Sequence, residues 1–278
     1  MAVESRAIEK LANWLAEGAS VVVVRVKSVK GSAPREDDAV MGVTATAMAG
    51  TIGGGQIEWR ALEHARAILA GKTGPGALDI ALGPEIGQCC GGRVELDFSP
   101  LDGALMDSLA HEARETERDL SHVLVFGAGH TGKALATALA PLPVRTMLVD
   151  SRPQAFGDFV SPVAKKVTAL PEEAVHDAPA NSAFVTMTHE HSLDFLITAE
   201  ALKRNDAAYV GMIGSATKRA VFLNWLKDNG YGHESGDKLI CPIGGRSVKD
   251  KRPEVIAALT AAEILGAVYA GQDTRPGN

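Results

Sequence analysis

The chain has 278 residues, of which 46% are hydrophobic, and a formal net charge of -6. This length suits two domains with hydrophobic cores, and the mildly acidic balance argues against a nucleic-acid-binding surface. Three cysteines do not describe a disulfide framework, which favours a reducing compartment. The opening MAVESRAIEK lacks the apolar region of a signal peptide, and the run VVVV is too short to span a membrane. We therefore expect a cytoplasmic protein that binds neither nucleic acid nor membrane.

The first hundred residues predict a small α+β domain. Residues 5–17 place Ile8, Leu11 and Leu15 on one face of a helix. The stretch SVVVVRVKSV at 20–29 is rich in β-branched residues and predicts a buried strand. Further elements follow: one or two short strands in 40–52, a helix that follows the glycines at 53–55 and ends at Gly71, and strands at 77–82 and 93–98.

Two of the cysteines are adjacent, in the sequence GQCCGG at 87–92. A disulfide between Cys89 and Cys90 would be strained, because a trans peptide sets neighbouring Cα atoms about 3.8 Å apart and disulfides span about 4.4–6.8 Å. A structural zinc site is disfavoured, because it needs about four ligands, usually in spaced cysteine pairs, and the sequence has no Cys-x-x-Cys. Inert packing stays open as a third interpretation. The flanking glycines favour a reactive or ligand-binding thiol, because they fill a core poorly and let a ligand approach.

The second half of the chain has a different pattern. A polar stretch at 101–119 predicts a connecting helix, and from Ser121 onward strands alternate with helices up to a last helix that begins near Pro253. Such alternation predicts a parallel sheet covered by helices. The predicted fold class is α/β, in three parts: a smaller N-terminal α+β domain at 1–100, a connecting helix at 101–120 and a Rossmann-like parallel-sheet domain at 121–278.

A glycine-rich fingerprint opens the second domain. The sequence VFGAGHTG places Gly127, Gly129 and Gly132 in the G-x-G-x-x-G pattern, and Asp150 ends the next predicted strand. Glycines let the backbone approach a phosphate, and the helix that follows offers free N–H groups. Asp150 could bind a ribose diol, so NAD(P) or another nucleotide is one predicted ligand. The same turn also serves other phosphate-bearing ligands, or architecture alone.

Two further regions could contribute polar groups. His189 and His191, in THEH at 188–191, follow a predicted strand at the end where such sheets place ligands, and they could act as proton donors or metal ligands. They could equally be plain loop residues. In the first domain, Gln56 and Glu58 open a helix just after three glycines, which suggests an anion cradle or a structural turn.

The second domain contains another glycine turn, in GMIGSATKR at 211–219. Lys218 and Arg219 lie one turn into the helix that follows, where they could meet an anion or face solvent. Cys241, which precedes a proline, is expected to be structural.

Several of these segments together resemble the xanthine dehydrogenase accessory proteins of the XdhC/CoxI family. The resemblance covers nearly the whole chain, through the segments KGSAPRED, TIGGGQIEW, LGPEIGQCCGGRVEL, THEHSLD, YVGMIGSATKRAVF and CPIG…KRPEVIA. The glycine-flanked cysteine pair is the most distinctive of them and indicates the xanthine dehydrogenase branch of the family.

The resemblance implies a chaperone for the molybdenum cofactor, or molybdopterin. Such a protein binds the cofactor, assists its sulfuration by a cysteine desulfurase and passes it to the molybdenum subunit of xanthine dehydrogenase. It also implies a homodimer. Cys89 or Cys90 would contact molybdenum, a soft site that suits thiolate. The other cofactor-binding residues expected are Gln56, Glu58, Gly127, Gly129, Gly132, Asp150 and His189.

A second hypothesis is an NAD(P)-dependent oxidoreductase. It rests on the fingerprint from Gly127 to Asp150, with His189 as proton donor. The cysteine pair separates the two hypotheses, because hydride transfer has no need of it. The sequence therefore favours an accessory protein over an enzyme.

Overall fold

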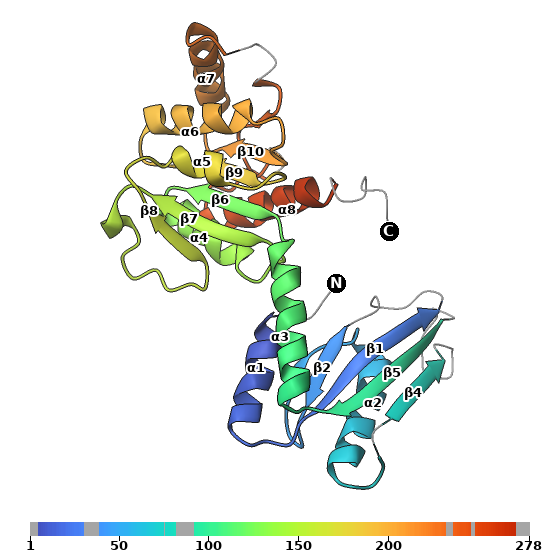
Figure 1. Ribbon diagram of the computed structural model, residues 1–278. Coiled ribbons are helices and arrows are strands. Elements are labelled where there is room, and N and C mark those ends of the chain that lie inside the picture. The colour runs from blue at the N-terminus through green and yellow to red at the C-terminus, as the bar shows by residue number, and fades with distance from the viewer. Residues whose placement is uncertain are drawn as a thin grey trace. The chain divides into compact units, whose positions relative to one another are not determined.

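The computed structural model describes residues 5–30, 39–74, 76–81, 92–231, 236–245 and 248–270. The chain divides into two compact units, Met1–Asp119 and Leu120–Asn278. Figure 1 shows an antiparallel sheet with its helices in the first unit and a parallel sheet with its helices in the second. The α/β fold class predicted from the sequence is confirmed.

The first unit is a five-stranded antiparallel sheet with helices on both faces. Its described elements are, in chain order, α1 (Ser5–Ala16), β1 (Val22–Lys30), β2 (Val40–Val43), β3 (Met48–Gly50), α2 (Gly55–Leu69), β4 (Gly76–Ala81), β5 (Arg93–Pro100) and α3 (Gly103–Arg118). The strand order is β3-β2-β1-β5-β4. Every neighbouring pair in this sheet is antiparallel.

The valine run of β1 is buried on both faces of this sheet. Val22 and Val24 belong to the core that α2 covers, whereas Val21 and Val23 belong to the core beneath α1 and α3. Successive side chains of a strand point to opposite faces, so an unbroken apolar run fits a central strand covered on both sides. Figure 1 shows α1 and α3 together on one face and α2 on the other.

The helix predicted at 101–119 is α3, and it packs against α1 within the first unit. Asp102 caps its N-terminus by accepting a hydrogen bond from the Leu105 N–H at 2.8 Å. Arg25 of β1 donates to both carboxylate oxygens of Glu112, at 2.9 and 3.1 Å, and so ties α3 to the sheet.

The second unit is a six-stranded parallel sheet. Its described elements are β6 (His122–Phe126), α4 (His130–Leu139), β7 (Arg145–Asp150), the 3₁₀ helix η2 (Pro153–Ala155), β8 (Ala164–Val167), α5 (Glu173–Asp177), β9 (Ala183–Thr186), α6 (His191–Lys203), β10 (Tyr209–Met212), α7 (Ala216–Asp228), β11 (Leu239–Ile240) and α8 (Pro253–Ala270). The order β8-β7-β6-β9-β10-β11 is that of Rossmann domains, 3-2-1-4-5-6 counted from β6.

Strand β6 lies at the centre of this sheet and contributes to both of its cores. Val123 and Val125 pack with α4 and α8, whereas Leu124 and Phe126 pack with α5, α6 and α7. Figure 1 shows α4 and α8 on one face and α5 and α6 on the other. Cys241, expected to be structural, is buried in the core of the second group.

Three short elements of the second unit have no counterpart in the sequence prediction. Strand β8 is a mostly exposed edge strand that contains Lys165 and Lys166, so it shows no hydrophobic alternation. Helix α5 has five residues and β11 has two, both too short to produce a periodic pattern.

Helix α8 is long and apolar enough to cross a membrane by its length and composition. It packs against α4, however, and buries Ala257, Ala261, Ile264 and Val268 in the core. This packing accounts for the apolar residues on the buried face of the helix.

The packing of α8 predicts the effect of truncating one side chain. Replacing the fully buried Ile264 with alanine should lower the free energy of unfolding of the second unit by about 2–5 kcal/mol, because it leaves a cavity. The exposed Ala262→Ser substitution on the same helix is the control and should change it by less than about 0.5 kcal/mol. Urea unfolding measures both variants. Equal effects would contradict the packing of α8 in this core.

Candidate functional site

The candidate site lies at the carboxyl edge of the parallel sheet. All the strand pairs described in this sheet are parallel, so β6, β9 and β10 end at the same edge. The chain reverses its direction of strand addition between β6 and β9, which are neighbours. In sheets of this kind, ligands bind in the crevice outside such a switch point.

The glycine turn that follows β6 packs closely against its surroundings. Gly127 has a φ of 113°, and a Cβ there would lie 2.4 Å from the Met187 carbonyl oxygen. A Cβ on Gly132 would lie 1.8 Å from the Gly127 carbonyl oxygen. Both positions therefore require glycine for internal reasons, whether or not a ligand binds.

Gly129 has a different environment. A Cβ at this position would meet no described atom within 4 Å. Its backbone is extended and it is the N-cap residue of α4, where it offers no side chain to the helix. The first N–H groups of a helix have no partner within the helix. Helix N-termini with such free N–H groups are common phosphate-binding sites, and the position at which a Gly129 Cβ would lie is open beside this one.

Asp150 is engaged by the protein itself. Its side chain is only 3% exposed, and Oδ2 accepts the Ala128 N–H at 2.8 Å. Oδ1 accepts the Arg152 backbone N–H at 2.9 Å, and the Arg152 guanidinium donates to both oxygens at 3.1 Å. The predicted contact with a ribose diol is untested, but in this structure the carboxylate holds the glycine turn instead.

The same bonds alter the acidity of Asp150. Burial is the largest influence and raises the pKa of the carboxyl group. Hydrogen bonds from Arg152 and from the Ala128 N–H outweigh burial, so the pKa lies below its ordinary value of 3.8. The carboxylate is therefore the form that the fold stabilises.

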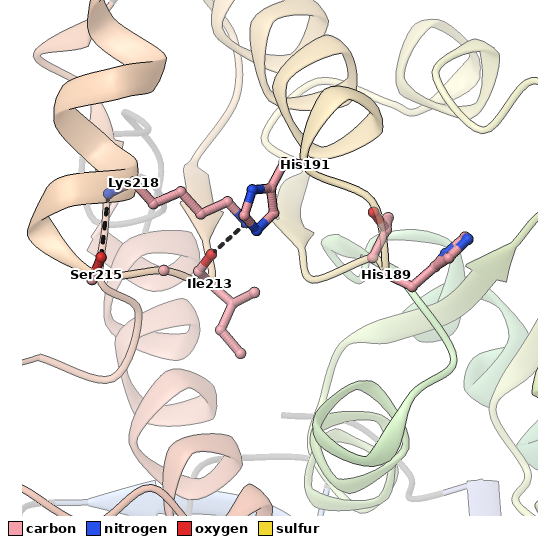
Figure 2. Close-up of a pocket in the computed structure, with 7 residues that line it drawn as sticks. His189, His191, Ile213, Ser215 and Lys218 are labelled. Carbon is pink, nitrogen blue, oxygen red and sulfur yellow. Dashed lines mark hydrogen bonds between the residues drawn. The ribbon is translucent and has the colours of Figure 1, made fainter.

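A pocket opens beyond the ends of β9 and β10. It has a volume of about 350 Å³ and is lined by Thr188, His189, His191, Ile213, Gly214, Ser215 and Lys218. Figure 2 shows Ser215 and Lys218 on one wall, and His189 and His191 on the segment that follows β9. The predicted proton donor His189 thus lines the pocket, but its exposed imidazole points away from Lys218 and Ser215.

Lys218 is held by an ion pair with Asp194. Its Nζ lies 2.5 Å from Asp194 Oδ2 and donates to the Ile213 carbonyl oxygen at 3.0 Å. Asp194 lies on α6 and is fully buried, and its Oδ1 accepts the Thr188 N–H at 2.8 Å. Sequence reasoning identified Lys218 as a possible anion contact but missed Asp194. The available signal was a single charge in the otherwise apolar stretch LDFLIT.

In the first unit, Glu58 folds back onto the glycine segment that precedes α2. Its Oε2 accepts the backbone N–H groups of Ile52 and Gly54, each at 3.2 Å, and the Thr51 hydroxyl. The N–H groups expected to cradle an anion thus bind the protein's own carboxylate. Gln56 is exposed on the same helix, and its predicted contact with a cofactor is untested.

Cys89 and Cys90 lie outside the described residues. The strands on either side of them, β4 and β5, pair up to Ala81 and Arg93. An ion pair between Arg93 and Asp79, at 2.6 Å, connects the two strands beside that pair. Within the described ranges, no group of three or more His, Cys, Asp or Glu residues could hold a metal ion.

Models of two protein families match the chain. The one described as the XdhC Rossmann domain matches residues 123–264, and the one described as the XdhC and CoxI family matches residues 14–80. The first match covers about half of the chain and lies in the second unit, whereas the second match lies in the first unit.

Similarity extends to a curated protein and to a solved structure. The uncharacterized protein YqeB of Escherichia coli is 23% identical over 258 residues, which cover 87% of this chain and 42% of that protein. The chain thus spans about two fifths of the length of this relative. The crystal structure of a xanthine dehydrogenase from Bacillus halodurans matches with a TM-score of 0.72 and 18% identity, over 98% of both chains. At this identity, the likeness shows the fold alone.

The lowered pKa of Asp150 predicts a pH-dependent contribution to stability. The contribution is fully present above the unfolded pKa of about 3.8 and is lost as pH falls through the lower folded value. Asp150→Asn should therefore cost about 1–3 kcal/mol near neutral pH, because it disrupts buried hydrogen bonds. Its stability should also fall less steeply than that of the parent below about pH 4.

The control for this prediction is Asp158→Asn, which removes the same charge from an exposed position. Thermal unfolding across the acidic range measures all three proteins. Parallel pH profiles for the parent and Asp150→Asn would contradict the role assigned to this carboxylate.

Proposed function

Since the chain belongs to the XdhC and CoxI family, we propose that it is an accessory protein of xanthine dehydrogenase. In this proposal it binds the molybdenum cofactor as cargo, assists its sulfuration and delivers it to the enzyme. The observation that carries the proposal is the pair of family matches, one in each unit. The similarity to a solved structure described as a xanthine dehydrogenase supports the same fold over both units.

The glycine turn of the second unit fits the phosphate of such a cargo. Gly129 is the N-cap residue of α4, and the position that its Cβ would occupy is open. A side chain at this position would fill the space that we propose for the phosphate. The N–H groups of the first helical turn would bind the phosphate oxygens. Gly127 and Gly132 shape the turn, and Asp150 holds it through Ala128. In this role the residues bind and orient the cargo, and none of them reacts.

The engagement of Asp150 favours this reading over an NAD(P)-dependent oxidoreductase. A dinucleotide site relies on an acidic residue at this strand end to bind the ribose hydroxyls. Here the Asp150 oxygens accept hydrogen bonds from Arg152 and Ala128. A ribose would have to compete with bonds that the fold already makes, whereas a phosphate on the turn would not.

We assign the metal end of the cargo to Cys89 or Cys90. The cofactor supplies a molybdenum ion held by dithiolene sulfur, which is a soft site and accepts thiolate. The thiolate is also the nucleophilic form of cysteine, so the same residue suits a relay of sulfur. Glu58, whose carboxylate binds the preceding glycine segment, would shape the loop beside Gln56.

The proposed partners follow from the proposed role. Delivery requires the molybdenum subunit of xanthine dehydrogenase, and sulfuration requires a cysteine desulfurase. Both complexes would be transient, because the accessory protein must release its cargo. A homodimer is part of the same proposal.

Loss of the paired thiols should reduce molybdenum binding much more than stability. We expect the Cys89→Ala and Cys90→Ala double variant to copurify with little molybdenum and to lose no more than about 1 kcal/mol of stability. The two single variants should differ in molybdenum content, because one thiolate contact is enough to bind the metal reversibly. Elemental analysis gives the molybdenum content and circular dichroism gives the folded state.

Cys241→Ala is the matched control for the thiol pair, because it removes a buried thiol from the core of the second unit. It should keep its molybdenum. A folded double variant with as much molybdenum as the parent would rule out the cysteine pair as the metal contact.

The partner proposal predicts selective complexes. Cofactor-loaded protein should capture the cofactor-free molybdenum subunit of xanthine dehydrogenase and a cysteine desulfurase in pull-downs. The same subunit already carrying its cofactor should bind more weakly, because its insertion site is filled. Failure to capture either partner with loaded protein would count against the accessory role.

A further inference from the structure

The pocket beyond β9 and β10 adjoins the glycine turn that the proposed function uses, because Thr188 of its lining lies next to Gly127, but the two are formed by different residues. Its lining residues come from the segment that follows β9 and from the loop and helix that follow β10. The glycine turn, in contrast, follows β6. The Gly127–Gly132 turn contributes no residue to the pocket lining.

The side chain of Lys218 follows a path that a glycine makes possible. A Cβ on Gly214 would lie 2.7 Å from Lys218 Cδ and 3.1 Å from its Cβ. Because Gly214 has no side chain, the stem of Lys218 folds back along the loop toward the end of β10. Its Nζ there reaches the Ile213 carbonyl oxygen (Figure 2).

Asp194 fixes this ammonium group in place. The carboxylate is fully buried and is itself held by the Thr188 N–H at the end of β9. Oδ1 of Asp194 thus accepts the N–H of Thr188, just after β9, and Oδ2 accepts the ammonium group of Lys218. The Lys218 side chain is 12% exposed, so it is largely withdrawn from solvent while still lining the pocket.

The wall of the pocket formed by Lys218 and the start of α7 offers hydrogen-bond donors. An ammonium group has three N–H donors, and among the described residues Lys218 Nζ bonds to two acceptors, Asp194 and Ile213. The first turn of α7 begins at the pocket wall, where Ser215 caps the helix by accepting the Lys218 N–H at 3.2 Å. Each Asp194 oxygen already accepts a hydrogen bond, one from the Thr188 N–H and the other from the Lys218 ammonium group.

We propose that this pocket is an anion-binding site for a phosphate or carboxylate group of a small ligand. Lys218 is the residue that contacts the anion, with its third donor and its positive charge. Asp194 is a positioning residue that holds the ammonium group at the pocket wall. The N-terminus of α7 adds unpaired N–H groups and the positive end of its dipole on the same side.

The site also has a defined relation to the glycine turn. Strands β10 and β6 are both neighbours of β9, and strands in a sheet lie about 4.8 Å apart. The two strand ends are therefore separated by about 10 Å along the sheet edge. A ligand with two anionic groups at this separation would engage both positions. The proposal itself concerns the pocket alone and does not depend on the identity of the cargo.

The test measures the binding of inorganic phosphate to the full chain by equilibrium dialysis at constant ionic strength. A Gly129→Val background blocks the glycine turn and leaves the pocket, since the space at Gly129 is open and its extended backbone accepts valine. We expect this protein to bind phosphate saturably. Adding Lys218→Gln together with Asp194→Asn should weaken binding about tenfold or more, because a charge-assisted hydrogen bond is lost.

Two choices make the test specific. The charges of Lys218 and Asp194 are removed together, because a buried carboxylate left alone would destabilise the fold. Lys227→Gln, which removes the same charge from the other end of α7, is the matched control and should bind as the background does. Gly214→Ala keeps both charges but displaces the Lys218 stem, so it should also weaken binding.

The outcomes separate this proposal from the proposed function. Phosphate binding by the parent that disappears in folded Gly129→Val protein would place all binding at the glycine turn and overturn the pocket site. Equal phosphate affinity with and without the Lys218 and Asp194 charges would overturn it as well. Loss of phosphate binding on charge removal in the Gly129→Val background supports the pocket. The molybdenum content of the otherwise unchanged chain carrying Lys218→Gln and Asp194→Asn tests the cargo proposal separately.

Discussion

The carboxylate of Asp150 holds the glycine turn of the second unit against the end of β7. One oxygen accepts the Ala128 N–H and the other accepts the Arg152 N–H, so the turn and the strand end form one hydrogen-bonded piece. Helix α4 begins directly after this turn, and its N-terminus is therefore placed by the same bonds. The N–H groups of Gly127 and Ala128 are thus bonded within the protein, and the N–H groups without a partner inside a helix are those of the first turn of α4.

Buried or partly buried carboxylates accept backbone N–H groups of loops at several places among the described residues. Glu58 binds the N–H groups of the glycine segment before α2, Asp150 binds those of the turn after β6, and Asp194 binds the Thr188 N–H and the Lys218 ammonium group. Each carboxylate holds a loop in one conformation through hydrogen bonds to its backbone or to a neighbouring side chain. Fixing a loop before a ligand arrives reduces the entropy that binding must overcome.

How much the sequence predicts depends on the kind of interaction that decides each feature. Burial depends on residue type, so the buried strand β1 and the start of helix α8 are predicted close to where they are observed. The choice of hydrogen-bond partner is different, because the pattern around Gly127 is the same whether Asp150 bonds a ribose or Ala128. Asp194 escapes prediction because its importance comes from Lys218, which is 24 residues away in the chain. The edge strand β8 has no alternation to detect.

The edge strands decide where another chain could extend these sheets. Strands β3, β8 and β11 contain three, four and two residues, and short edges offer little backbone for pairing. Strand β4, with six residues from Gly76 to Ala81, is the longest of the described edges. A protein that recognises this chain by adding a strand to a sheet would find its longest template there. Such a strand would lie beside the part of the first unit that leads, in sequence, to the paired cysteines.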